Sequence, residues 1–162
     1  MTPIFLLEEL AAFVKEMTSD IILPVRVARE GKEDKSRAAN VYKMALPKKE
    51  DQTQKAPYIL LQVLNGKDDQ QPGAVSSATA TIRIVFVTYG EDAQEGECNL
   101  LNLISRVRSE LEKKVLIGNK FALQMPLEYI IYPDNTPPYF IGEMVTNWSC
   151  PTITREVEEI WQ

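Results

Sequence analysis

The stretch ATIRIVFVTYGED, residues 80–92, changes character along its length. In its first half, isoleucines alternate with Thr81 and Arg83, which is the pattern of a strand with one buried face. In its second half, residues 85–87 (Val-Phe-Val) are apolar on both faces, and this pattern is typical of a strand that is covered on both sides. The second half therefore needs a cover on a face that the first half leaves polar.

Two helices are predicted around this strand. The first spans residues 3–19, where Thr2 suits the N-cap and Pro3 the first helical position. The second spans residues 93–117 and ends before Gly118. Apolar residues at steps of three and four form one stripe along it: Leu100, Ile104, Val107, Leu111 and Val115. The second helix is therefore amphipathic and has one face for a core.

Strands are predicted at residues 57–66, 78–89, 121–132 and 139–150. Pro126 cannot donate to a strand ladder, so the third strand should lie at an edge or bulge. The order of the elements predicts an α+β fold with a mainly antiparallel sheet of four strands, or slightly more. The long helix and the N-terminal helix are expected to pack against this sheet. The N-terminal helix either joins the long helix on one face or caps the end of the sheet.

The length and composition predict one soluble domain spanning residues 1–162. The chain has 162 residues, of which 44% are hydrophobic and 25% charged, and these values are typical of a globular protein. Residues 29–56 are expected to be a polar excursion with a short strand near residues 42–46, and residues 151–162 a tail. The net charge of −5 provides no general attraction to nucleic acid or anionic lipid.

No catalytic or cofactor site is predicted. The chain has no histidine, which excludes Ser-His-Asp and Cys-His catalysis and histidine-ligated zinc or haem. The seven glycines form neither a phosphate loop nor a dinucleotide fingerprint. Cys98 and Cys150 are expected to be free thiols of a protein in a reducing compartment. No apolar run approaches the roughly 20 residues that span a bilayer.

Two pairs of carboxylates are candidates for a metal site or a catalytic pair. Asp68 and Asp69 could suggest a metal site, but adjacent carboxylates point apart in an extended chain, so a solvated loop is favoured. Glu128 and Glu143 lie on the two strands of the last hairpin and could approach each other. Exposed strand positions account for these glutamates as well, so no enzyme activity is predicted.

The apolar strands also indicate self-association. One long helix covers only one face of such a sheet, and the N-terminal helix does not clearly supply enough surface for the other. We therefore expect another copy of the chain to cover the remaining apolar strand surface.

An ordered set of motifs within residues 57–150 carries a family resemblance. A strand closes on an acidic turn, and the helix CNLLNLISRVRSELEKK (98–114) follows it. The next predicted strand begins at GNKF (118–121), and PPYFIGEMVTNW (137–148) forms the last predicted strand. In this order and spacing the region resembles the tail terminator (tail completion) proteins of bacteriophages with long, non-contractile tails.

The resemblance implies a structural protein that forms a hexameric ring. Such a ring caps the tail tube, stops its polymerisation and offers a surface to the head-tail connector protein. Its partners are other copies of itself, the tail tube protein and the connector, with no membrane, no cofactor and no sequence-specific nucleic acid. The expected location is the tail or neck of the virion, after assembly in the cytoplasm of a host bacterium that carries the phage or prophage.

Two sets of residues are predicted to make the contacts of the ring. The candidates for the subunit interface are Arg83, Val85, Val87, Tyr89 and Glu128. The second set lies in a predicted loop, residues 67–77, and is expected to contact a partner along the ring axis: Lys67, Asp68, Asp69, Gln70 and Gln71.

Two other classes of protein remain open. The chain could be another neck, head-completion or tail-tube component of the same particle, and a tube protein should polymerise without an end whereas a terminator should stop as a ring. It could also be an unrelated cytoplasmic binding module, for which a deep pocket between the long helix and the sheet would be the sign.

Overall fold

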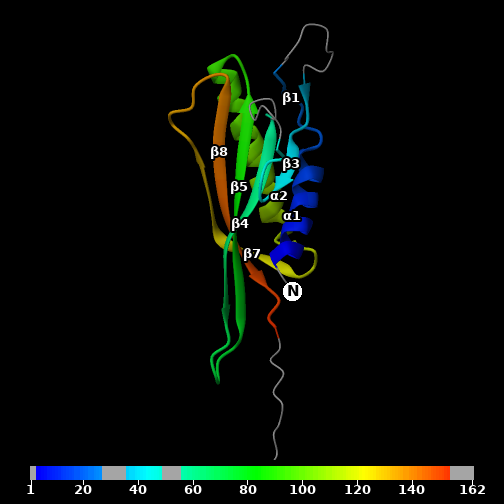
Figure 1. Ribbon diagram of the computed structural model, residues 1–162, viewed down its shortest axis with the longest axis vertical. Coiled ribbons are helices and arrows are strands. Elements are labelled where there is room, and N and C mark those ends of the chain that lie inside the picture. The colour runs from blue at the N-terminus through cyan, green and yellow to red at the C-terminus, as the bar shows by residue number, and fades with distance from the viewer. Residues whose placement is uncertain (1–2, 27–35, 49–55, 154–162) are drawn as a thin grey trace, which may run out of the picture.

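The computed structural model describes residues 3–26, 36–48 and 56–153 (Figure 1). Much of the predicted excursion, at residues 29–35 and 49–55, and most of the predicted tail lie outside the described residues. The helices are α1 (Pro3–Thr18) and α2 (Ala93–Lys114). The strands are β1 (Leu23–Pro24), β2 (Ser36–Arg37), β3 (Asn40–Lys43), β4 (Tyr58–Asp69), β5 (Ser77–Tyr89), β6 (Leu116–Ile117), β7 (Phe121–Ile131) and β8 (Tyr139–Cys150).

The expectation of a mainly antiparallel sheet of four strands, or slightly more, is wrong, because the sheet is larger and mixed. The described residues form an α+β fold with a six-stranded mixed sheet in the order β3-β4-β5-β8-β7-β6, and β1 and β2 form a separate two-stranded sheet. The pairing of β3 with β4 is parallel. The short strand expected near residues 42–46 corresponds to β3 at Asn40–Lys43, although no partner was predicted for it. The strand β6 was missed because two residues are too few to show an alternating pattern.

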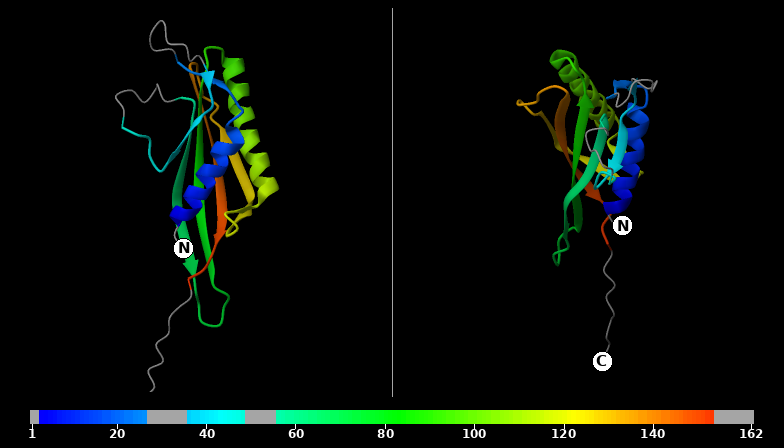
Figure 2. Two further views of the ribbon diagram at one scale, coloured as in Figure 1. Left: turned by 90° about the vertical axis from the view of Figure 1, so that its right-hand side faces the viewer. Right: turned by 45° about the horizontal axis from the view of Figure 1, so that its top comes forward.

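Both helices pack on the same face of the six-stranded sheet (Figure 2). Leu6, Leu10 and Val14 of α1 belong to one buried cluster with the apolar stripe of α2. The even-numbered residues of β5 from Ala78 to Thr88 are buried against this helical layer. Neither of the two helices in the described part of the chain lies on the opposite face of the sheet.

The ends of α2 are set by local chemistry. The carboxylate of Asp92 accepts a hydrogen bond of 2.9 Å from the backbone N–H of Glu95, which caps the start of the helix. At its end, Val115 has a φ of 61° and its N–H donates to the carbonyl of Leu111. The helix therefore ends at Lys114, three residues before the predicted end, and the next residues form β6.

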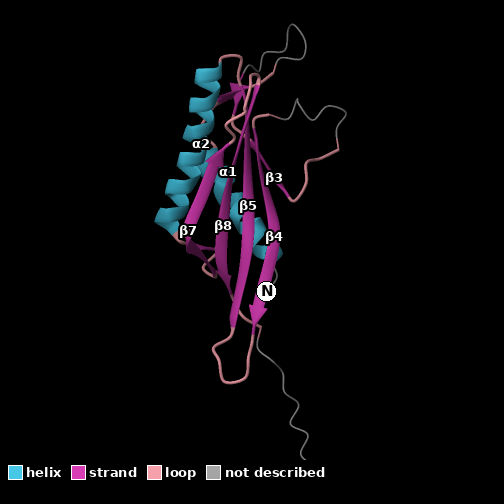
Figure 3. Cartoon of the chain, turned by 90° about the vertical axis from the view of Figure 1, so that its left-hand side faces the viewer, coloured by secondary structure: helices cyan, strands magenta, loops and turns pink. Residues whose placement is uncertain are grey.

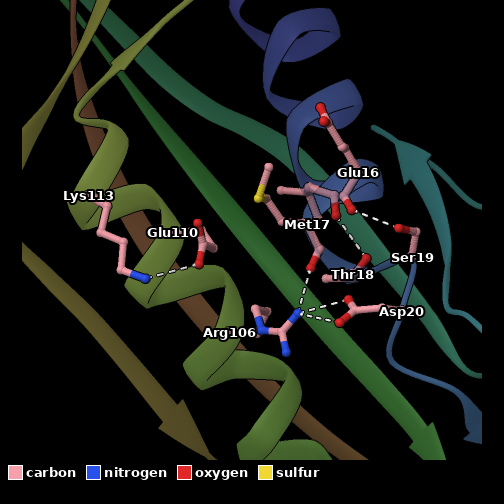
Figure 4. Close-up of polar contacts among 9 residues, drawn as sticks. Glu16, Met17, Thr18, Ser19, Asp20, Arg106, Glu110 and Lys113 are labelled. Carbon is pink, nitrogen blue, oxygen red and sulfur yellow. Dashed lines mark hydrogen bonds and ion pairs between the residues drawn. The ribbon is translucent and has the colours of Figure 1, made fainter.

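Polar contacts join α2 to the end of α1 (Figure 4). The guanidinium of Arg106 donates to the carbonyl of Met17 at 3.3 Å and to the carboxylate of Asp20 at 2.8 Å. The hydrogen bond from Arg106 lowers the pKa of Asp20 below its ordinary value. Lys113 and Glu110 form a further ion pair within α2 at 3.3 Å. These contacts hold the helical layer together on one side of the sheet.

Candidate functional site

The sheet face opposite the helices is the first candidate site, and we call it the open face. Its residues alternate with the buried ones along each strand, and the register aligns them across neighbouring strands. On the central strands they are Leu60, Arg83, Val85, Val87, Ile141, Glu143 and Val145. No described helix lies over these residues (Figure 2), so their exposure to water depends on the neighbouring strands and side chains.

All five predicted interface residues lie on the open face. Arg83, Val85, Val87 and Tyr89 follow one another along β5, and Glu128 of β7 is brought into the same row as Arg83 through Val145 of β8.

The open face is less exposed than its sequence suggested. Val87 and Leu60 retain only 5% and 9% exposure within one subunit, although no helix covers them. Ile130, at the β7 edge, is 51% exposed. The apolar surface left for a partner is therefore concentrated toward β7 rather than at the centre of β5.

A polar cluster occupies the middle of the open face. The Nε atom of Arg83 donates to the carboxylate of Glu143 at 2.6 Å, and the hydroxyl of Tyr132 donates to the same oxygen at 3.0 Å. This hydrogen bond to Glu143, with a further one to Tyr132, raises the pKa of Arg83. Beside the cluster, the hydroxyl of Thr81 donates to the side-chain oxygen of Asn147 at 2.8 Å. The sequence identified Arg83 but did not pair it with Glu143 or Tyr132, because these residues lie 60 and 49 positions further along the chain.

A groove opens where β7 bulges away from β8. Four steps along β7, from Gln124 to Glu128, face only two steps along β8, and Pro126 lies within this irregular segment. The groove has a volume of about 580 Å³, and its lining consists of Leu127, Glu128, Tyr129, Ile130, Glu143 and Val145. Pro126 was the signal in the sequence that a bulge or an edge occurs here.

The groove combines apolar walls with two carboxylates, of which only one forms an ion pair within the subunit. Glu143 is already paired with Arg83, whereas Glu128 is exposed and has no ion pair among the described residues. Both glutamates line the groove, and Oε2 of Glu143 already accepts hydrogen bonds from Arg83 and Tyr132. The arrangement suits a partner that brings apolar side chains and a cation.

The second candidate site is the far end of the β4–β5 hairpin, residues 64–77, which we call the arm (Figure 3). The arm extends beyond the helices, and its residues 64–68 are exposed. The loop predicted at residues 67–77 is shorter than expected, because Lys67, Asp68 and Asp69 pair with β5 as strand residues. The long ladder was missed because polar strand residues that contact no core show no apolar alternation.

Gln70 and Gln71 lie in the turn of the arm, as the prediction of a contact loop required. The side-chain amide of Gln70 donates to the carbonyl of Ile153 at 2.7 Å, which ties the turn to the segment after β8. Gly73 allows the turn through its φ of 79°, and Val75 is 95% exposed. The tip therefore offers the exposed Gln71 and Val75 to a partner, whereas Gln70 is half-buried and bonded to Ile153.

The described residues contain no group of three metal-ligating side chains, and none of their helices is long and apolar enough to cross a membrane. Cys98 is exposed and Cys150 is half-buried, and both are free thiols. Burial raises the pKa of Cys150, with a further contribution from Asp68, so its thiolate is disfavoured.

Comparison with known proteins gives no family. No family model matches the chain, and no curated protein matches it. One solved structure, whose name states no activity, aligns over 91% of this chain and 92% of its own with a TM-score of 0.48 and 11% sequence identity. A likeness of this strength carries no conclusion about function.

Proposed function

We propose that this chain is a structural tail terminator protein of a phage or prophage with a long, non-contractile tail. Copies of the chain form a ring, with six as the expected number, that caps the tail tube and ends its growth. The ring then offers its other surface to the head-tail connector. The protein acts by binding and needs neither catalysis nor a cofactor.

One observation carries the proposal on the structural side: the sheet face opposite both helices holds all five predicted interface residues. The face combines apolar side chains with polar groups that are already paired within the subunit, and in a contact between folded subunits apolar area contributes stability while polar groups set the orientation. The ordered motifs of residues 98–148 add the resemblance to terminators.

The tip of the arm supports a second role. Gln71 and Val75 are exposed at the end of the arm, where a tube end or a connector can reach them. Six arms in a ring repeat a weak contact six times, so modest affinity per arm is sufficient for stable capping.

The decisive experiment inactivates the chain in the phage or prophage that encodes it. We expect tails of uncontrolled length that do not join heads, and restoration of normal particles when the chain is supplied in trans. Tails of normal length and normal joining would contradict the proposal. Electron micrographs of the pure chain separate the related roles, because a terminator stops as a closed ring whereas a tail-tube protein forms open-ended tubes.

A further inference from the structure

The six-stranded sheet has unpaired edges on both sides. On one side, β3 pairs with β4 only along residues 58–61, and residues 64–69 have no outer partner strand among the described residues. On the other side, β6 pairs only with residues 121–122 of β7, and residues 127–131 likewise have no outer partner strand there. Unpaired backbone N–H and C=O groups on an edge are a template for another strand.

We propose that residues 64–68 of one copy add as an antiparallel strand to residues 127–131 of a second copy. The direction is correct, because β4–β5, β5–β8 and β8–β7 are all antiparallel, so β4 and β7 run in opposite directions. The sheets of two copies can therefore continue into each other with their open faces on the same side. The inference rests on the proposed ring and identifies the contact that forms it.

One register brings two charges without ion pairs together. Lys67 lies on the open side of the arm, opposite Thr79, and Glu128 lies on the open face, opposite Val145. Both side chains belong to exposed residues, and neither has an ion pair among the described residues. With Lys67 directly across from Glu128, an ammonium and a carboxylate meet on the same face of the joined sheet.

The same register matches the residues on the other face. Gly66 comes to lie opposite Tyr129, whose ring is 43% exposed. A Cβ atom on Gly66 meets only the carbonyl of Thr79 at 3.5 Å, which is an ordinary contact, so the subunit itself does not require glycine there. In the joined sheet this glycine leaves room for the tyrosine ring of the neighbouring copy.

A second charge pair follows from this arrangement. The guanidinium of Arg108 lies 5.6 Å from the centre of the Tyr129 ring, and its buried Nε has no hydrogen-bond partner among the described residues. Asp68 falls diagonally across from Tyr129 in the proposed register. Its carboxylate therefore arrives beside Arg108, and the contact joins two opposite pairs of charges.

The stagger of the proposed contact is compatible with closure. Within one subunit Lys67 is level with Ser149 of β8, whereas Glu128 is level with Val145. The shift of four positions is about 13 Å along the strands, against about 19 Å across four strands. These lengths tilt the strands by about 35°, close to the tilt at which sheets close into barrels. A contact between two different edges repeats around a ring in the same way.

The test reverses the charges separately and together. We expect Lys67→Glu or Glu128→Lys to raise the concentration needed for half-assembly about ten-fold or more, because like charges then meet. The double variant, Lys67→Glu with Glu128→Lys, should return it to the wild-type value. As matched controls, Lys114→Glu and Glu112→Lys change exposed charges of α2 and should leave assembly unchanged. Mass in solution is measured by light scattering on the full chain.

A disulfide reports the contact directly. Lys67→Cys and Glu128→Cys are combined in a chain whose two native cysteines are replaced by serine. Three strand spacings, about 14 Å, separate the two edges within one subunit, so a disulfide can form only between copies. Oxidation should give a ladder of linked subunits on a denaturing gel, and the pair Lys67→Cys with Glu112→Cys should give none.

The outcomes separate this inference from the proposed function. Assembly that ignores the single charge reversals, or rings that form no linked subunits on oxidation, overturns the strand contact and leaves the terminator proposal intact. A chain that stays monomeric at high concentration also overturns the strand contact, and the tail-length experiment then decides the function alone. Loss of assembly in the single variants with recovery in the double variant, together with the ladder, supports the contact.

Discussion

At the scale of single residues, close packing constrains a few positions more than their chemistry suggests. Gly96 lies in the first turns of α2, against the ring of the fully buried Phe140. A Cβ atom built on Gly96 overlaps three atoms of that ring. The absence of a side chain therefore lets α2 approach β8, and helix propensity alone would have favoured alanine here.

We expect Gly96→Ala to lower the free energy of unfolding by about 1–3 kcal/mol, because overpacking of a filled core outweighs the gain in helix propensity. Urea unfolding followed by circular dichroism measures the change. Gly66→Ala is the matched control at concentrations where the chain is monomeric, since its added Cβ makes only an ordinary contact within the subunit, and its unfolding should stay close to that of the wild type. Equal stability of the Gly96 variant and the wild type would show that Phe140 moves aside freely.

At the scale of elements, the end of α2 is a point of strain. Val115 closes the helix with φ 61° and ψ −48°, a conformation that a β-branched residue rarely adopts. Its side chain is 47% exposed and contributes little to the core. The conformation is retained because the N–H of Leu123 in β7 donates to the carbonyl of Val115 at 2.8 Å. The start of β7 thus holds the helix end in place.

Val115→Gly should raise the free energy of unfolding by about 0.5–1 kcal/mol, because glycine adopts positive φ without steric cost. The expected sign is opposite to that of an ordinary truncation of an apolar side chain. Thermal and urea unfolding measure it, and Val115→Ala is the control that shortens the side chain but keeps a Cβ. If the glycine variant is less stable than the alanine variant, relief of backbone strain is not the dominant effect.

At the scale of the whole molecule, the helical layer stabilises the subunit, whereas the open face carries the candidate contacts for assembly. The buried cluster of α1, α2 and the sheet lies entirely on the helical side. The open face and the arm carry the candidate contacts, and they extend to the β7 edge. A substitution on the open face should therefore change association more than it changes the stability of the subunit.

Ile130→Asp should lower the average mass in solution and leave unfolding of the subunit within about 0.5 kcal/mol of the wild type, because a charge at an exposed contact residue costs little until a partner buries it. Ile4→Asp is the matched control, since Ile4 on α1 is 50% exposed and Ile130 is 51% exposed. Light scattering and thermal unfolding are measured on the same samples. Equal effects of the two variants on mass would exclude a special role for the β7 edge.

Local patterns were sufficient for the long elements. The amphipathic stripe of α2 and the alternation of β5 and β8 depend on neighbouring side chains, so their spacing is visible in a single chain. The same reasoning missed β6, which is too short for a period to appear, and placed the short strand β3 about two residues late and without a partner. It also read Lys67 to Asp69 as loop, because these residues pair with β5 without touching a core.

Patterns in the sequence were sufficient to predict the two helices and the four long strands, and the lack of histidine excluded histidine chemistry. The folded structure was needed to establish that β3 pairs in parallel with β4 and that both helices pack on one face of the sheet. It was also needed to show that Arg83 forms hydrogen bonds with Glu143 and Tyr132. The two kinds of feature differ in the distance along the chain over which they are set. Helical and strand periods are set within a few residues, whereas strand partners and edges depend on registers between residues far apart in the chain, such as Ala78 and Cys150.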